Sequence, residues 1–315
     1  MPLRAAQGVV EHWAGRRVLW LVLLLHVSTF LDDAIRMALD YEVQRQTFEV
    51  VCGASGNQEP VRVVSAICSH IVGFPAAMPY ISVAWQLTGS ILVLSRYLPQ
   101  AGCLMLASWT VVQPFVYAQQ GSPTFVFTSA TVLGGILILL ASEILRARLA
   151  RDPRASAADL DRLLLAGRVL LVGLFFWKGV EQIASCLRTD FDSLPNTVLH
   201  CALLVLLALI TGLVVIGLKV RRIALFLATA LIASAPVSYP WFITCCGAKK
   251  WFMADVVMEG AWQGKYEIDA STAADQQRYY FWQRLAAAGG LLQLALFGGG
   301  AHSADTLLEE RESLI

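Results

Sequence analysis

The sequence carries little charge. Only 15% of its 315 residues are Asp, Glu, Lys or Arg, and 57% are hydrophobic, whereas soluble domains are about 25% charged. The net charge is +1 and no block of Lys or Arg is present, which excludes the basic surface that a nucleic-acid partner requires. The mean hydropathy of +0.61 comes from repeated long apolar runs. We therefore predict an all-α bundle of membrane-spanning helices in the lipid bilayer.

The sequence also lacks the common motifs of catalytic and metal sites. It has no CxxC, no HExxH, no Walker loop and no N-x-S/T sequon. The seven cysteines are mostly scattered in apolar runs, where a buried thiol behaves as a small hydrophobic group. We therefore expect no enzymatic activity, no catalytic residue, no metal and no cofactor.

Eight segments are long and apolar enough to cross the bilayer, which requires about 20 helical residues. They are residues 17–37, 76–97, 100–118, 124–146, 163–187, 197–218, 223–243 and 279–297. A shorter apolar stretch at 61–73 precedes the second segment, so the start of that segment is left open. Arg16 and Arg17 resemble the basic start of a signal peptide, but the run that follows is long enough to span, so we interpret it as a retained helix.

The basic residues lie unevenly on the two sides of these spans. Fourteen Lys and Arg residues fall on the side of the N-terminus, eight fall on the far side and two lie within spans. Positive charge collects on the cytosolic side of membrane proteins. An even number of spans with this bias predicts that both termini are cytosolic and that the far side is the lumen.

Three short sequences recur in the same order in the two halves of the chain. Residues 15–19 match 167–170, residues 87–96 match 210–220, and residues 134–140 match 289–296. In the second pair a basic residue follows a threonine by eight positions, at Arg96 and at Lys219. Chance similarity between Leu-rich helices is the alternative. The order of the matches favours two parallel four-helix repeats, residues 1–150 and 151–315, with a charged linker at 148–162.

The first span ends in a polar stripe. Four side chains share one helical face, with Asp32 beside them: His26, Thr29, Asp33 and Arg36. One arginine cannot neutralise two carboxylates, so we expect surplus negative charge at the lumenal end, facing a water-filled cavity. The alternative is that these charges mark the membrane boundary, with Arg36 reaching to the interface.

A second polar group lies in the fifth span, where Lys178 and Glu181 are three residues apart. The two groups occupy corresponding places in the two halves. We therefore expect them to share one cavity that opens to the lumen.

Three cysteines fall on the lumenal side of this topology: Cys52, Cys245 and Cys246. In an oxidising lumen, Cys52 can form a disulfide with either of the other two. The sequence leaves the pairing, and whether it forms, open.

Four segments resemble the Surfeit locus 4 family of membrane proteins. They are RVLWLVLLLHVSTFLDDAIRM, QLTGSILVLSRYLPQAGC, GGILILLASE and LAGRVLLVGLFF. The pieces STFLDDAIRM and QLTGSILVLSR are the specific ones, and the resemblance covers most of the chain outside 53–75, part of 148–162 and 245–277. That family looks related to the bacterial DoxX-type four-helix proteins, which agrees with the internal repeat.

The resemblance implies a multi-pass cargo receptor of the endoplasmic reticulum and Golgi membranes. Such receptors collect soluble secretory proteins in the lumen, through short hydrophobic segments near the cargo N-terminus, and load them into COPII vesicles. We add a hypothesis from the residues: Asp32 and Asp33 pair with the α-amino group that signal cleavage exposes on a cargo. The predicted cargo-binding residues are His26, Thr29, Asp32, Asp33, Arg36, Lys178 and Glu181.

Two other functions stay open. An eight-helix bundle with a polar cavity also suits a small-molecule or lipid transporter or scramblase, although the first span is Leu, Val and Trp on the cytosolic side of His26. An oxidoreductase, by analogy with DoxX relatives, would require a quinone or thiol site that no motif supports. The cargo and any homo-oligomer are left open by the sequence.

The C-terminal tail departs from the resemblance. Family members commonly end in a lysine-rich retrieval signal that COPI coats read, whereas this chain ends DTLLEERESLI. Glu310, Leu314 and Ile315 fit the acidic dileucine pattern that clathrin adaptors read, and two terminal apolar residues also suit COPII export. The alternative is a polar tail in which Leu and Ile are incidental.

Overall fold

The computed structural model describes residues 16–53, 74–117, 119, 121–151, 158–188, 194–245, 250–251, 254–255, 270–300 and 303–305. Its helices are α2 (Arg16–Leu39), α3 (Tyr41–Gly53), α5 (Phe74–Ser95), α6 (Pro99–Val116), α7 (Pro123–Arg151), α8 (Ala158–Leu171), α9 (Gly173–Arg188), α10 (Leu194–Ile216), α11 (Val220–Ser238), α12 (Trp241–Thr244) and α13 (Ala270–Phe297). The strands β1 (Lys250–Trp251) and β2 (Ala254–Asp255) form one antiparallel pair. Apart from this short pair, the secondary structure of the described residues is helical, which confirms the predicted all-α class.

Five stretches of the described chain are long and apolar enough to cross a membrane. They are Arg17–Leu39, Ala76–Ser95, Pro123–Arg151, Leu160–Glu181 and Val220–Thr244. The other predicted spans are also helical, as α6 with 18 residues, α10 with 23 and α13 with 28. The chain is therefore a multi-pass membrane protein, as its hydropathy predicts.

The span predicted at 163–187 is confirmed as Leu160–Glu181, with a local break at Val172 that separates α8 from α9. The hydroxyl of Thr131 on α7 explains the break. It accepts a hydrogen bond from the backbone N–H of Leu174 at 2.8 Å, so this donor does not need a partner within its own helix. Two further differences are that α13 begins at Ala270 rather than at 279, and that α3 was not predicted.

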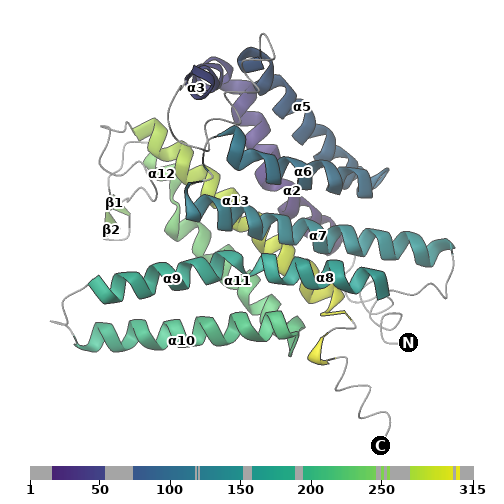
Figure 1. The fold of residues 1–315 in the computed structure, drawn as a ribbon, viewed down its shortest axis with the longest axis vertical. Helices are drawn as coiled ribbons and strands as arrows, with labels where there is room; N and C mark the ends of the chain where they lie inside the picture. The colour runs from purple at the N-terminus through teal and green to yellow at the C-terminus, as the bar shows by residue number, and fades with distance from the viewer. Residues whose placement is uncertain are drawn as a thin grey trace, which may run out of the picture.

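The helix α13 lies at the centre of the bundle. It packs against α2, α7 and α11, and Figure 1 shows it, in yellow-green, crossing the middle of the molecule. On one side α5 packs against α2 and α6, while α6 also packs against α7. On the other side α9 and α10 pack against each other at the edge of the view. The two predicted halves are therefore joined through α13 into one bundle.

Glycines allow α7 and α13 to cross at very short range. A Cβ on Gly290 would lie 2.8 Å from the Cα of Gly135, and a Cβ on Gly289 would lie 2.8 Å from the backbone N of His26 on α2. Gly134 meets the backbone of α8 in the same way, because a Cβ there would lie 2.4 Å from the N of Leu171. We name the contact of Gly135, Gly289, Gly290 and His26 the glycine crossing. Small residues at such contacts are typical of packed membrane helices.

Two turns have the same unusual backbone conformation. Arg96 follows α5 with φ of 57°, and Lys219 follows α10 with φ of 50°. Among the described residues these are the only non-glycine residues with positive φ, a region that residues with a Cβ rarely adopt. They are also the two basic residues that the second internal sequence match aligns. The turns after α5 and α10 are therefore equivalent in sequence and in backbone conformation.

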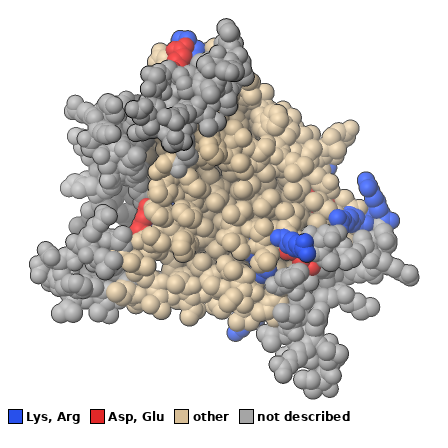
Figure 2. Space-filling view, in the orientation of Figure 1, with Lys and Arg blue, Asp and Glu red and all other residues tan. Residues whose placement is uncertain are grey.

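One face of the bundle carries a broad uncharged surface. In Figure 2, Lys and Arg gather near the end of α7 and a mixed group lies near α3, with a broad surface of other residues between them. Large apolar side chains are exposed on the bundle, among them Leu21, Ile91 and Phe226. Exposed Arg151 and Arg162 lie where α7 ends and α8 begins. Such an arrangement is expected of a surface whose solvent is lipid.

The glycine crossing can be tested by adding one methyl group. We expect Gly290→Ala to lower stability by roughly 1–3 kcal/mol, because the new Cβ overlaps backbone atoms that cannot move aside. Gly212→Ala on α10 is the matched control, since a Cβ there meets nothing within 4 Å and alanine favours the helix. Thermal unfolding of the purified protein in detergent measures both variants. Equal midpoints for the two would argue against a tight crossing.

Candidate functional site

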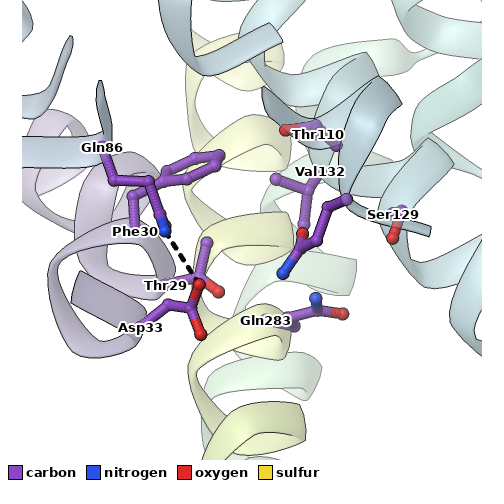
Figure 3. A pocket seen from close by; sticks show the side chains of 9 residues that line it. Thr29, Phe30, Asp33, Gln86, Thr110, Ser129, Val132 and Gln283 are labelled. Atoms are coloured by element: carbon purple, nitrogen blue, oxygen red, sulfur yellow. Dashed lines mark hydrogen bonds between the residues drawn. The ribbon is translucent and has the colours of Figure 1, made fainter. Parts of the chain in front are cut away.

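A small polar cavity lies where α2, α5, α6, α7 and α13 meet. It is lined by Thr29, Phe30, Asp33, Gln86, Thr110, Gln113, Ser129, Val132 and Gln283. Its volume is about 10 Å³, which is room for about one water molecule. Figure 3 shows polar side chains from each of these helices around one space. All but two of the lining residues are polar, in contrast to the apolar surface of the same helices. We name this space the polar cavity.

Asp33 is the charged group of the polar cavity, and it is 3% exposed. Its Oδ1 accepts a hydrogen bond from Nη2 of Arg36, one turn along α2, at 2.8 Å. Its Oδ2 accepts from Nε2 of Gln86 on α5 at 2.9 Å, as the dashed line in Figure 3 marks. The same Gln86 nitrogen donates to Ser82 at 2.8 Å. A buried carboxylate is stable only when paired in this way.

Several polar atoms of the polar cavity have no partner. Within the described residues these are Oε1 of Gln86, Oγ of Ser129 and Oε1 of Gln283, all fully buried. Nε of Arg36 is also buried without a partner. Each such atom costs about 1–3 kcal/mol in desolvation that no hydrogen bond offsets. The cavity is therefore an incomplete polar site.

A second ion pair joins α2 to α13 beside the first. Oδ1 of Asp32 accepts a hydrogen bond from Nε of Arg278 at 2.7 Å, with side chains 14% and 20% exposed. The guanidinium of Arg278 also lies 6.0 Å from the ring centre of Trp241, a cation–π contact. We name Asp32 and Arg278 the mouth ion pair. Arg278 is thus a partner of the second carboxylate that the sequence analysis did not predict.

His26 lies in the glycine crossing and does not line the polar cavity. Its Nδ1 lies 3.0 Å from the carbonyl oxygen of Val22, and its Nε2 lies 3.2 Å from the carbonyl oxygen of Gly135 on α7. The crossing is one to two helical turns from the cavity along each of α2, α7 and α13. It therefore closes the cavity on the side where α2 begins.

Lys178 and Glu181 form a separate group on α9. Oε2 of Glu181 accepts from Lys178 at 2.8 Å, and Oε1 accepts from Thr124 at 2.9 Å and from Trp177 at 2.6 Å. Neither residue lines the polar cavity. The expectation that both polar groups share one cavity is wrong. Glu181 accepts its hydrogen bonds from Thr124 on α7 and from Trp177 and Lys178 on its own helix, and none of these residues lines the polar cavity.

Other predicted residues lie outside the described side chains. These are Cys52, Cys246, Glu310, Leu314 and Ile315. Cys245 is exposed, and its Sγ donates to the carbonyl oxygen of Phe242 at 3.3 Å. The disulfide and the sorting signal therefore stay predictions.

The helix α3 carries charges at the end of the bundle where α2 stops. Arg45 donates from Nε to both carboxylate oxygens of Glu42 at 3.2 Å and forms a second ion pair with Glu49. These hydrogen bonds hold the pKa of the Glu42 carboxyl below its ordinary value. The group is exposed, so solvent screens it and its pairs contribute little to stability.

Sequence reasoning missed most of the polar cavity. No site role was given from the sequence to Gln86, Gln113, Ser129 or Gln283. Glutamines within apolar spans are a usable signal, because an amide in hydrocarbon requires partners. Arg278 had no such signal, since it lies far from Asp32 in the sequence and only the fold brings them together.

A family model described as SURF4 family matches residues 14–310, which is nearly the whole chain. No solved structure matches the chain.

The mouth ion pair can be tested by a double-mutant cycle. We expect Asp32→Asn and Arg278→Gln each to destabilise the protein, because each leaves a half-buried charge without its partner. The double variant should lose less stability than the two single variants lose in sum, by about 0.5–3 kcal/mol. The exposed pair of Glu42 with Arg45, changed in the same way, should give a coupling of only about 0.2–1 kcal/mol. Thermal unfolding measures both cycles, and a coupling near zero for Asp32 with Arg278 would rule out the contact.

Proposed function

The chain belongs to the SURF4 family, and we propose that it is a cargo receptor of the endoplasmic reticulum membrane. In this proposal it binds soluble secretory proteins in the lumen and packages them into COPII vesicles for transport to the Golgi. Family membership over residues 14–310 implies the receptor role and a non-enzymatic, multi-pass membrane protein. The cargo, the coat and the site are the parts that we propose.

The observation that favours a receptor is that the polar cavity is closed on one side. The glycine crossing leaves no space for a methyl group between α7 and α13, so the polar groups on its two sides are separated. A binding site requires access from one side, whereas a transporter requires a path through the bundle. Polar contacts do exist beyond the crossing, such as Gln293 with Ser142 at 3.0 Å. A transporter or scramblase would therefore have to open the crossing.

We propose that eight segments cross the membrane in two parallel repeats, residues 1–150 and 151–315. The segments are α2, α5, α6, α7, α8 with α9, α10, α11 and α13. The matching turns at Arg96 and Lys219 support the repeat, and so does the meeting of the two Gly-Gly pairs at the glycine crossing. With both termini cytosolic, the polar cavity and the mouth ion pair lie toward the lumen.

Cargo contact in this proposal is made at the lumenal mouth of the bundle. Asp32, Asp33 and Arg36 lie there, and the ion pairs that they form are partly accessible: the side chain of Arg36 is 17% exposed. Thr29 lines the polar cavity below them. His26 supports this site from the glycine crossing, and the group of Lys178 and Glu181 flanks it on α9.

The start of the C-terminal tail is fixed to the bundle. The carboxylate of Asp305 accepts hydrogen bonds from the backbone N–H groups of Lys219 at 2.7 Å and Val220 at 3.1 Å. These are orphan donors at the start of α11, so Asp305 caps that helix from outside. A sorting signal at Glu310, Leu314 and Ile315 would thus leave the bundle from a fixed point, where a coat adaptor can bind it.

The receptor function can be tested by proximity labelling in secreting cells. A labelling enzyme inserted between residues 255 and 270, on the proposed lumenal side, should enrich newly made secretory proteins, because a receptor holds its cargo in the lumen. The same enzyme on an unrelated multi-pass protein of that membrane is the control. Equal labelling of secretory proteins by the two would contradict the proposed function.

The tail signal predicts a change of location. We expect the double substitution Leu314→Ala with Ile315→Ala to change the distribution of the protein between early and late secretory membranes. The reason is that the tail no longer carries the two apolar side chains that an adaptor binds. Ser313→Ala lies in the same tail and should have no effect. Quantitative microscopy of tagged protein measures the distribution, and an unchanged distribution would show that these residues are incidental.

A further inference from the structure

Arg284 on α13 is a charged side chain within the membrane-spanning part of the bundle. It lies five residues before Gly289 of the glycine crossing, and it contacts α11 at Ser234 and Ser238. Both serines lie inside the apolar span Val220–Thr244, and the nearer of them is six residues from its end. A charged side chain at such a depth is costly, and it usually pairs with another group or marks a ligand site.

The partners of Arg284 carry no charge. Its Nη1 donates to Oγ of Ser238 at 2.8 Å and to Oγ of Ser234 at 3.5 Å, and its Nη2 donates to the hydroxyl of Tyr239 at 3.5 Å. Its guanidinium carbon also lies 4.4 Å from the ring centre of Tyr239, a cation–π contact. In the part of the chain that the structure describes, every ion pair involves another basic residue. The charge of Arg284 is therefore solvated by dipoles and a ring but not neutralised.

Arg278 on the same helix shows which partner Arg284 lacks. Arg278 also lies near an aromatic ring, 6.0 Å from the centre of Trp241, but it pairs with Asp32 at 2.7 Å as well. Arg284 has the ring without the carboxylate. A guanidinium carries five N–H groups in a planar fork, and the three contacts of Arg284 leave two of them for a further acceptor. This fork fits the paired oxygens of a carboxylate or a phosphate.

The surface around Arg284 indicates that the missing anion is part of a lipid. Ser238 is exposed and Arg284 is partly exposed, so an anion can approach from outside the bundle. The large side chains exposed on this part of α11 and on α12 are apolar: Val237, Phe242 and Ile232, which are 54%, 41% and 39% exposed. A water-soluble anion would have to enter hydrocarbon to reach the guanidinium. A lipid brings acyl chains that cover these apolar side chains at the same time.

We propose that Arg284 and Ser238 bind the phosphate of an anionic phospholipid at the surface between α11 and α13. Arg284 donates its two remaining N–H groups to phosphate oxygens. Ser238, whose Oγ accepts from Arg284, donates its own hydroxyl proton to the same phosphate. A lipid with a net charge of −1 neutralises the site, whereas a zwitterionic lipid brings a second cation with its phosphate. The bound lipid holds α11 against α13, the helix that carries Gln283 of the polar cavity and Arg278 of the mouth ion pair.

Matched variants separate this lipid site from surface charge in general. Arg284→Gln removes both the charge and the fork, while Arg284→Lys keeps the charge alone. Arg222→Gln is the control, because it removes an exposed positive charge from the other end of α11. Arg284→Gln leaves no carboxylate without its partner, so we expect the variant to fold. Ser238→Ala tests the hydroxyl and leaves the charge in place.

The experiment is native mass spectrometry of the full chain in detergent, which counts bound lipids. The probes are phosphatidylinositol and phosphatidylcholine with the same acyl chains. We expect the unchanged protein to bind one phosphatidylinositol at least about tenfold more tightly than phosphatidylcholine, and Arg284→Gln to lose this preference. Arg284→Lys and Ser238→Ala should each weaken it by about threefold or more, and Arg222→Gln should keep it. Phosphatidylinositol should also raise the midpoint of thermal unfolding of the unchanged protein and not that of Arg284→Gln.

Two competitors distinguish the sources of the anion. Inorganic phosphate that displaces phosphatidylinositol would show that the acyl chains are not needed, and oleate that displaces it as well as the phospholipid does would assign the site to a fatty-acid carboxylate. Either result would overturn the assignment to a phospholipid. Equal affinity of the unchanged protein for the two phospholipids, or the same loss of preference in Arg222→Gln and Arg284→Gln, would overturn it too. Cargo labelling in cells reports on the receptor function separately from all of these results.

Discussion

The contact of α7 with α13 at Gly135 and Gly290 sets the position of the polar groups in this bundle. Lipid chains are as apolar as leucine, so membrane helices associate through close packing and polar contacts rather than through the hydrophobic effect. The two glycines bring the backbones together, and Gly289 brings α2 to the same point through His26. From this point the helices carry Thr29, Asp33, Ser129 and Gln283 to one level, where they surround the polar cavity.

Charge neutrality is the second constraint on the site. Burying an unpaired charge is costly, and a paired one is stable only with good geometry. The pairs of Asp33 with Arg36 and of Asp32 with Arg278, at 2.8 and 2.7 Å, give each of the two α2 carboxylates a cationic partner.

The positions of the helices could be predicted from the sequence, because a run of about 20 apolar residues has few alternatives to a membrane helix. The helix break at Val172 could not, since it depends on the hydroxyl of Thr131 in another helix. The stripe of Thr29, Asp33 and Arg36 was predicted from helical spacing alone. The partner of Asp32 was not, because Arg278 lies 246 residues away in the sequence and only the packing of α13 against α2 brings it close.

The central claim is that the polar cavity is reached from the lumen and closed toward the cytosol. Substituted-cysteine labelling of Asp32→Cys at the mouth of the bundle, in sealed microsomes and with a small reagent that cannot cross membranes, tests it most directly, with the unchanged protein as the background for its native cysteines. We expect no modification of intact microsomes, modification once their membranes are permeabilised, and protection by a bound cargo peptide. Modification of intact microsomes would mean that the cavity is open to the cytosol, and the account would then be wrong.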